Sequence, residues 1–113
     1  MISLACKTIS FEELIRCAFN INKTEYEVFK KLIDDKLCSS EDIQKTLNKD
    51  LTTIQRSLKS LSQKNLVERK QINLDKGGYK YYYTSIPKDE IRKAVLGNLD
   101  NFREKVEQKI AQL

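Results

Sequence analysis

With 113 residues, the chain is long enough for one domain with an appendage but not for two domains. A charged fraction of 33% and a hydrophobic fraction of 40% are typical of a soluble globular protein and exclude the composition of a disordered chain. The sequence contains no histidine, which removes the commonest general base at neutral pH and every Ser-His or Cys-His nucleophile pair. We therefore expect neither an enzyme nor a bound cofactor.

The three cysteines do not fit a metal site. Cys6, Cys17 and Cys38 lie far apart without a CxxC spacing, and no histidine is present to complete the usual four zinc ligands. They are expected to be free thiols, buried or half-buried, and no metal is expected.

The sequence has no feature of a membrane or secreted protein. Its longest uncharged stretches are far shorter than the roughly 20 apolar residues that span a bilayer. The first residues lack the basic start and sustained apolar run of a signal peptide. A cytoplasmic protein is expected.

The net charge of +5 is concentrated in one part of the sequence. Residues 49–80 contain eight basic and three acidic side chains, and this surplus of five accounts for the whole net charge. The basic residues of the segment are Lys49, Arg56, Lys59, Lys64, Arg69, Lys70, Lys76 and Lys80. A charged run is usually only a solvated face, but a local excess on an otherwise balanced chain indicates binding to a polyanion.

Two capping boxes start the first two predicted helices. Ser10–Glu13 and Thr24–Glu27 each combine a capping hydroxyl with a carboxylate three residues later, which predicts helices over about 11–19 and 24–36. The apolar stripe of the first helix is Phe11, Leu14, Ile15 and Ala18, and that of the second is Val28, Phe29, Leu32 and Ile33.

The next segment predicts a helix-turn-helix. Ser39 or Ser40 caps a short helix over about 40–47, and Asp50 caps a second helix over about 51–64. The buried stripe of the second helix is Ile54, Leu58 and Leu61. Two short helices joined by a tight turn form a helix-turn-helix, although many such pairs in helical proteins bind nothing.

After this pair the hydrophobic period changes to that of strands. The segments "LVERKQINL" and "YKYYYTSI" surround "DKGG", which predicts a hairpin whose tip turns with positive φ at Gly77 and Gly78. Tyr79, Tyr81 and Tyr83 fall on one face, and Lys80, Tyr82 and Thr84 on the other. We expect most of the tyrosine rings to pack against the helices, with one face of the hairpin on the helical core.

The C-terminal segment predicts one long helix. Pro87 occupies a first-turn position, and the helix continues to the end of the sequence. Its apolar residues, at spacings of 4, 4, 3, 4, 4 and 3, are Ile91, Val95, Leu99, Phe102, Val106, Ile110 and Leu113. A helix of about 35–40 Å exceeds the width of a small domain, so its distal half is expected to need another chain.

The expected fold is therefore mainly α with a small β-hairpin, an α+β class. We divide it into an N-terminal arm (1–9), a winged helix-turn-helix domain (10–86) and a C-terminal dimerisation helix (87–113). Two copies of the helix are expected to pair, preferably antiparallel, through Val95, Leu99, Phe102, Val106, Ile110 and Leu113.

The order of elements resembles winged-helix DNA-binding regulators of the MarR/TrmB-like group and the small archaeal Lrs-like repressors. The resemblance covers residues 22–87 through "NKTEYEVFKKLID", "SSEDIQKTLNKDLTTIQRSLKSLSQKNLVER" and "DKGGYKYYYTSIP". It implies a homodimeric transcriptional regulator with recognition helices in major grooves and wings in adjacent minor grooves. The sequence departs from MarR proteins in its short N-terminal region and from TrmB proteins in lacking their sugar-binding C-terminal domain. No effector ligand is specified.

Candidate DNA contacts lie on the recognition helix and around it. Opposite Ile54, a face without acidic residues carries Thr52, Arg56 and Lys59, with Gln55 at its edge; Thr53 is a further candidate on the same helix. Arg56 matches guanine O6 and N7, Gln55 matches adenine N6 and N7, and the threonines suit either base or a thymine methyl group. Candidate phosphate or wing contacts are Ser40, Lys49, Lys70, Lys76 and Lys80.

Two other functions fit the same fold. A winged helix can serve protein assembly in the transcription machinery, but such a module does not need the concentrated basic charge. A winged helix can also bind RNA, and exposed aromatic rings among residues 79–83 would favour that function by stacking on bases.

Overall fold

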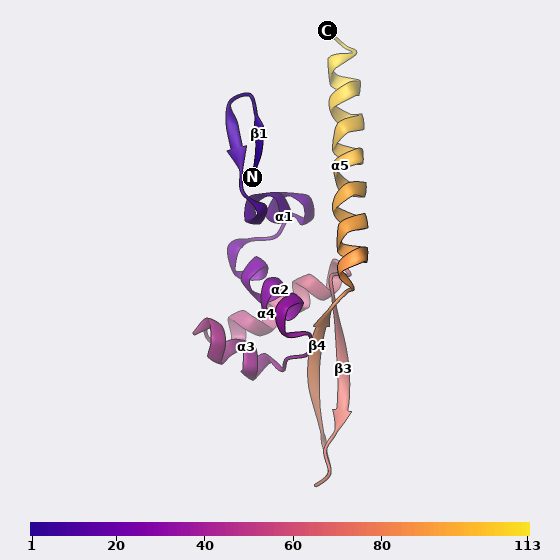
Figure 1. The fold of residues 1–113 in the computed structure, drawn as a ribbon. Helices are drawn as coiled ribbons and strands as arrows, with labels where there is room; N and C mark the ends of the chain where they lie inside the picture. Colours follow the sequence, from indigo (N-terminus) through magenta and orange to yellow (C-terminus); the bar gives the residue numbers. More distant parts are fainter. The chain divides into compact units, whose positions relative to one another are not determined.

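A computed structural model describes residues 1–113, which form five helices and two antiparallel hairpins (Figure 1). The chain divides into two compact units, one of residues 22–87 and one of residues 1–21 together with 88–113. The mixed, mainly helical fold with a long C-terminal helix is the predicted one. None of the helices combines the length and the apolar character needed to cross a membrane.

The unit of residues 22–87 contains three helices, α2 (Lys23–Asp35), α3 (Ser40–Leu47) and α4 (Leu51–Gln63). Their apolar faces meet in one core, which confirms the predicted stripes of α2 and α4 except that Ile33 is only half-buried. The largest fully buried side chains are Val28, Phe29, Leu32, Ile43, Ile54, Leu58, Leu61 and Leu66. Burying each such side chain contributes roughly 1.5–3 kcal/mol, so this core is what orients α3 and α4.

The start of α2 differs from the prediction. Asn22, not Thr24, is the N-cap: its side-chain oxygen accepts from the Glu25 N–H at 2.8 Å, and the Glu25 carboxylate accepts from the Asn22 N–H at 2.9 Å. Glu25 is buried, so both of its hydrogen bonds are shielded from water. Thr24 therefore lies inside the first turn, and the helix ends at Asp35, one residue earlier than expected.

The wing consists of β3 (Val67–Asn73) and β4 (Tyr79–Ser85), paired antiparallel with Val67 opposite Ser85 and Asn73 opposite Tyr79. The tip has φ values of +90° at Gly77 and +81° at Gly78, as predicted. At the base of the wing, the backbone of Cys38 exchanges two hydrogen bonds with Tyr83, at 3.0 and 2.7 Å. This bridge fixes β4 to the segment that leads into α3.

The tyrosines are less buried than expected. Tyr81, Tyr82 and Tyr83 are half-buried, and the ring of Tyr79 is 56% exposed. Only the base of the hairpin packs against the helices, because α2 and α3 contact β4 while the tip extends beyond them. The prediction that the rings pack on the helical core is therefore wrong for Tyr79.

The terminal unit contains a hairpin that was not predicted, β1 (Ile2–Leu4) and β2 (Lys7–Ile9), followed by α1 (Phe11–Phe19). The capping box of Ser10 and Glu13 starts α1 as expected. Phe11 was placed in the buried stripe of this helix, but it is exposed because it lies in the first turn.

The long helix α5 (Lys88–Ile110) completes this unit. Contrary to the prediction, the helix does not continue to the end of the sequence, because residues 111–113 form a turn in which the Gln112 N–H bonds to the Lys109 carbonyl. It begins directly after Pro87, which therefore precedes the helix rather than lying in its first turn. α1 packs against α5, where Ile91 and Val95 are buried and the Asn98 amide donates to the Ala18 carbonyl at 2.8 Å. Beyond this contact every residue from 96 to 113 is exposed.

The cysteines are free, as predicted, but only Cys38 is buried. Cys6 lies in the turn between β1 and β2, and Cys17 lies on α1; both are exposed, contrary to the expectation of buried or half-buried thiols.

Candidate nucleic-acid interface

The helix-turn-helix is built from two caps and one left-handed turn residue. Ser39 caps α3 together with Asp42, and Asn48 ends α3 with φ of +53° and its N–H bonded to the Gln44 carbonyl at 2.8 Å. Asp50 then caps α4 by accepting from the Thr53 N–H at 3.3 Å. These local bonds bring the chain from α3 into α4 within three residues and leave the first turn of α4 at the surface.

The Asp50 cap also engages the side chain of Thr53. The Thr53 hydroxyl donates to the Asp50 carboxylate, and Thr53 is half-buried. This side-chain hydrogen bond, followed by the one from the Thr53 backbone, lowers the pKa of Asp50 below its usual value. Asp50 therefore stays ionised at neutral pH, and the Thr53 hydroxyl proton is engaged within the chain.

The other four predicted residues of α4 form one exposed stripe. Thr52, Gln55, Arg56 and Lys59 are all exposed, while Ile54, Ser57, Leu58 and Leu61 are buried on the opposite side. The side chains of Gln55, Arg56 and Lys59 make no hydrogen bond or ion pair with the rest of the chain, although the charge of Arg56 contributes to the lowered pKa of Asp50. The stripe contains no carboxylate, so these side chains can donate to an outside acceptor.

The two candidate phosphate contacts beside α4, Ser40 and Lys49, differ in whether their polar groups are already hydrogen-bonded. Ser40 is buried at the start of α3, and its hydroxyl donates to the Glu41 carboxylate at 3.3 Å. Lys49 lies half-buried in the turn between the two helices. A phosphate would therefore meet Lys49 directly, whereas the Ser40 hydroxyl is already engaged.

One face of the wing carries two of the predicted lysines. Lys70 lies opposite Tyr82 and shares its face with Lys80, whose ammonium is 5.7 Å from the centroid of the Tyr82 ring. Hydrogen bonds from Ser39 lower the pKa of Asp42, and the charge of Lys80 adds to this effect. Lys80 therefore lies near α3, and Lys76 is exposed at the tip of the wing.

The other face of the wing holds a group that was not among the predicted contacts. The Arg69 guanidinium lies 4.1 Å from the centroid of the Tyr81 ring, and Tyr79 meets Tyr81 edge-on at 5.3 Å. Arg69 had been counted only as part of the basic segment. The strand alternation and the hairpin register place it beside the tyrosines, and that register was the available signal.

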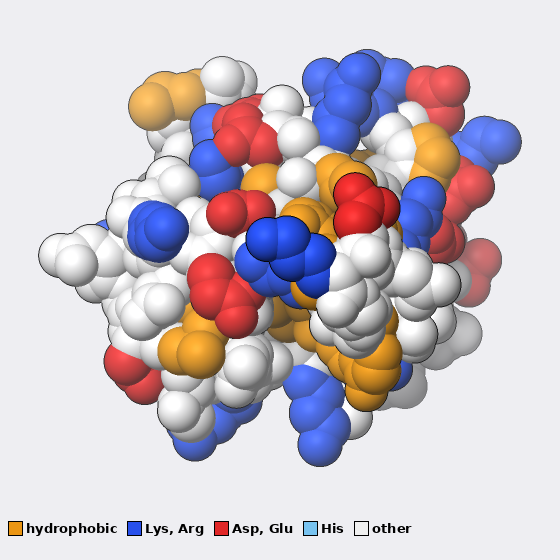
Figure 2. Space-filling view, turned by 90° about the horizontal axis from the view of Figure 1, so that it is seen from below, with side chains coloured by type: hydrophobic (Ala, Val, Ile, Leu, Met, Phe, Trp, Pro, Cys, Tyr) orange, Lys and Arg blue, Asp and Glu red, His pale blue; other side chains and the backbone are white.

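Seen from below, from the direction in which the wing points, the molecule presents basic side chains interleaved with acidic ones (Figure 2). Basic side chains are therefore not the only charged ones on this face. Binding to DNA through such a surface depends on individual placed side chains as well as on net charge.

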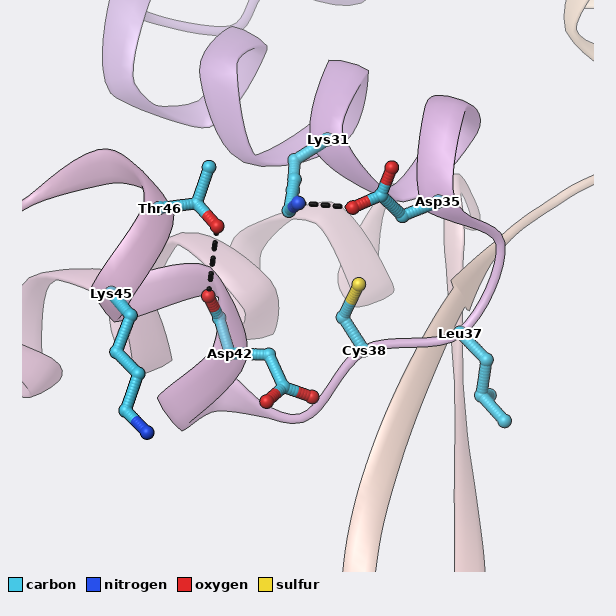
Figure 3. Close-up of a pocket in the computed structure, with 7 residues that line it drawn as sticks. All are labelled: Lys31, Asp35, Leu37, Cys38, Asp42, Lys45 and Thr46. Atoms are coloured by element: carbon cyan, nitrogen blue, oxygen red, sulfur yellow. Dashed lines mark hydrogen bonds and ion pairs between the residues drawn. The ribbon is translucent and has the colours of Figure 1, made fainter.

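A separate open depression of about 570 Å³ lies between α2 and α3 (Figure 3). Its polar groups satisfy one another: the Lys31 ammonium donates to Asp35, and the Thr46 hydroxyl donates to the Asp42 carbonyl at 3.2 Å. Burial raises the pKa of the Cys38 thiol, so it stays protonated at neutral pH. The Cys38 thiol in this depression is therefore not a reactive nucleophile.

Comparison with known proteins identifies the family of this chain. Residues 15–89 match the family model described as "Sugar-specific transcriptional regulator TrmB". A protein of Methanocaldococcus jannaschii described as uncharacterized is 30% identical over 102 residues, which cover 90% of this chain and 77% of that protein.

Solved structures similar to this chain are also described as transcriptional regulators. A "possible transcriptional regulator" from Methanosarcina mazei is 33% identical, with a TM-score of 0.87 over 99% of this chain and 95% of that chain. A regulator assigned to the MarR family from Enterococcus faecalis, 20% identical, has a TM-score of 0.57 over 98% of this chain and 100% of that chain, and it supports the fold alone. The predicted resemblance to archaeal TrmB- and MarR-like winged-helix regulators is confirmed.

Proposed function

Because this chain belongs to the TrmB family of transcriptional regulators, we propose that it binds double-stranded DNA in a sequence-specific manner and regulates transcription as a homodimer. The observation that carries the proposal is the exposed stripe of donors on α4, which lacks any carboxylate. A helix N-terminus with such a stripe is what winged-helix regulators place against base edges.

In the proposed complex α4 (Leu51–Gln63) lies in the major groove. Arg56 donates two hydrogen bonds to guanine O6 and N7, and Gln55 pairs with adenine N6 and N7. Thr52 contacts a thymine methyl group or a phosphate, and Lys59 contacts a phosphate. Thr53 orients the first turn through its bonds to Asp50 instead of reading a base.

The wing, residues 70–80, lies along the backbone or in the minor groove. Lys76 at the exposed tip reaches furthest, and Lys70 and Lys80 follow it on the face that also carries Tyr82. Lys49 contributes a phosphate contact from the turn before α4. Ser40 joins it only if its hydroxyl leaves Glu41.

The dimer forms through α5. Val95 is buried within its own chain, so it supports the helix from inside and does not meet the second copy. The interface is left to the exposed residues Leu99, Phe102, Val106, Ile110 and Leu113. Two-fold symmetry then places two recognition helices on half-sites of a rough palindrome, about one helical turn apart.

One observation favours RNA as a second candidate target. Tyr79 is exposed beside the Arg69–Tyr81 pair, and aromatic rings and guanidinium planes are surfaces on which unpaired bases stack. The basic stripe on α4 favours duplex DNA, because stacking on single strands does not require it.

Sequencing of genomic fragments retained by the purified protein tests the proposal. We expect an enriched inverted repeat, bound as a duplex with higher affinity than single-stranded RNA of the same sequence at every salt concentration. Retention of random fragments without a common motif would contradict a sequence-specific regulator. Stronger binding of the RNA would assign the wing, and not α4, as the main contact.

A further inference from the structure

The N-terminal hairpin has no packing partner within the chain. Residues 1–8 are all exposed, and the tie to α1 is an exposed ion pair of 3.4 Å between Lys7 and Glu13. The register places Ile2 opposite Ile9 and Leu4 opposite Lys7, so Ile2 and Leu4 lie on one face, where they are 55% and 71% exposed. An isolated two-stranded hairpin is marginal in water, so this face calls for a covering surface.

The distal half of α5 lacks a partner in the same unit. Leu99, Phe102, Val106, Ile110 and Leu113 are all exposed. Figure 1 shows the hairpin and this part of α5 extending to the same side of α1. The terminal unit thus presents two apolar surfaces on one side and covers neither.

The pattern of α5 fits a second copy of the same helix. The exposed apolar residues are spaced by 3, 4, 4 and 3, which reads the same in both directions around Val106. In an antiparallel pair with Val106 opposite itself, Phe102 meets Ile110, and Leu99 lies opposite Leu113, which follows the end of the helix. The large apolar residues of the segment then face one another, so the second copy matches this surface without any change of register.

The α5 pair alone is too small for a stable dimer. Residues 99–110 span about 17 Å at 1.5 Å per residue, and a helix is about 10 Å wide, so the contact strip covers on the order of 200 Å². Even twice this area falls far below the roughly 800 Å² per partner of a stable interface. The missing area must come from other exposed apolar residues. The terminal unit offers Leu96 on α5 itself and, outside α5, Met1, Ile2, Leu4 and Phe11.

We propose that the β1–β2 hairpin and Phe11 pack across the distal α5 of the second copy. Each α5 is then held between the other copy's α5 and its hairpin. This inference rests on the dimer in the proposed function and adds to it a second contact surface that is remote from the DNA-binding residues in sequence. It also gives the hairpin the covering surface that its own chain lacks.

Sedimentation equilibrium of the full-length chain tests this directly. Ile2→Ser with Leu4→Ser removes the apolar face, and the dimer dissociation constant should rise at least tenfold. Ser3→Asp with Thr8→Lys is the matched control, because these residues pair on the opposite face of the same hairpin and the new charges attract each other. The control should stay within about twofold of the natural chain.

The results distinguish failure of the proposed dimer from failure of the hairpin contact. If the natural chain sediments as a monomer of 13.2 kDa, the dimer in the proposed function fails. If the natural chain is a dimer and the apolar-face variant dissociates no more readily than the control, the dimer stands and the hairpin contact is overturned.

Crosslinking provides a readout that does not depend on stability. In a Cys17→Ser variant, Cys6 in the hairpin turn is the remaining exposed thiol, and a short maleimide–succinimide reagent joins it to nearby lysines. With light and ¹⁵N-labelled chains mixed, we expect mixed-isotope links from Cys6 to Lys105 or Lys109. Links confined to single chains, or none to α5, would overturn the proposal.

Discussion

The two units of this chain differ in whether their regular apolar stripes are buried. In residues 22–87, Phe29 is 1% exposed and the stripes of α2, α3 and α4 close on each other. In the terminal unit, Phe102 is 65% exposed, although it belongs to an equally regular stripe. The first unit completes its core with its own residues, whereas the second leaves its apolar stripe exposed. This difference is the basis of our proposal that one unit holds the DNA-contacting side chains and the other joins two copies.

The largest expected effect is on the free energy of unfolding, and it should differ between Phe29 and Phe102. Phe29→Ala leaves a cavity in a filled core and should lower the free energy of unfolding by about 3–5 kcal/mol. Phe102→Ala should lower it much less in dilute protein, because the ring is exposed in the single chain. Urea unfolding at several protein concentrations measures both. An equal decrease in dilute protein would show that α5 is covered within its own chain.

Charges placed in the α5 stripe should break the interface and spare the first unit. Phe102→Asp with Val106→Asp should give a folded monomer that binds its operator much more weakly, since each buried apolar side chain contributes roughly 1.5–3 kcal/mol to pairing. Sedimentation at micromolar concentration shows whether the variant is a monomer, and circular dichroism shows whether it is folded. The matched control is Asp100→Asn with Glu104→Gln, on the opposite side of α5. A variant that still dimerises would move the interface elsewhere.

A smaller effect is expected from the stripe on α4. Arg56→Ala should weaken specific DNA binding by about 1–3 kcal/mol if the guanidinium contacts a guanine. Thermal stability should be unchanged, because the Arg56 side chain is exposed in the folded chain. Binding to operator and random duplexes is compared by fluorescence anisotropy. Equal weakening on both would make Arg56 a phosphate contact.

The smallest effect concerns the wing. Lys76→Ala with Lys80→Ala should weaken binding to all duplexes and make the logarithmic salt slope shallower by about 1 for each phosphate that the wing no longer neutralises. Lys23→Ala with Lys30→Ala removes the same charge from exposed positions of α2 and serves as control. If both double variants change the slope equally, only the net charge matters and the wing makes no specific contact.

The sequence predicts best those elements whose ends are decided locally. Asp50 and Ser39 cap α4 and α3 as expected because each side chain reaches a backbone N–H three residues ahead. Asn22 and Thr24 both offer a capping oxygen with glutamate three residues later, so local chemistry alone does not identify the N-cap of α2. Asn22 is the N-cap because its partner Glu25 is buried, and that burial depends on the tertiary fold.

Features that depend on neighbours distant in sequence were harder to predict. The hairpin of β1 and β2 turns through Ala5 and Cys6, without the Gly or Asn residues that signal a tight turn. The exposure of Tyr79 depends on how far the wing extends beyond α2 and α3, which strand propensity does not specify. Within the candidate site, helical periodicity identified the exposed stripe of α4. It did not reveal that the Asp50 cap engages Thr53.

The spacing of the α5 stripe has a mechanical consequence. Its apolar residues recur after eleven positions, as Ile91 with Phe102 and Val95 with Val106. An eleven-residue repeat corresponds to about 3.67 residues per turn, slightly more than the 3.6 of a straight helix, so the stripe drifts slowly in the right-handed sense. In the proposed dimer, two such helices would therefore wind around each other slowly in the right-handed sense. The length of α5 in residues would set the span of the pair. Inserting eleven or seven residues would turn the stripe by about 20° in opposite directions, whereas inserting about eighteen, five full turns, would keep its direction.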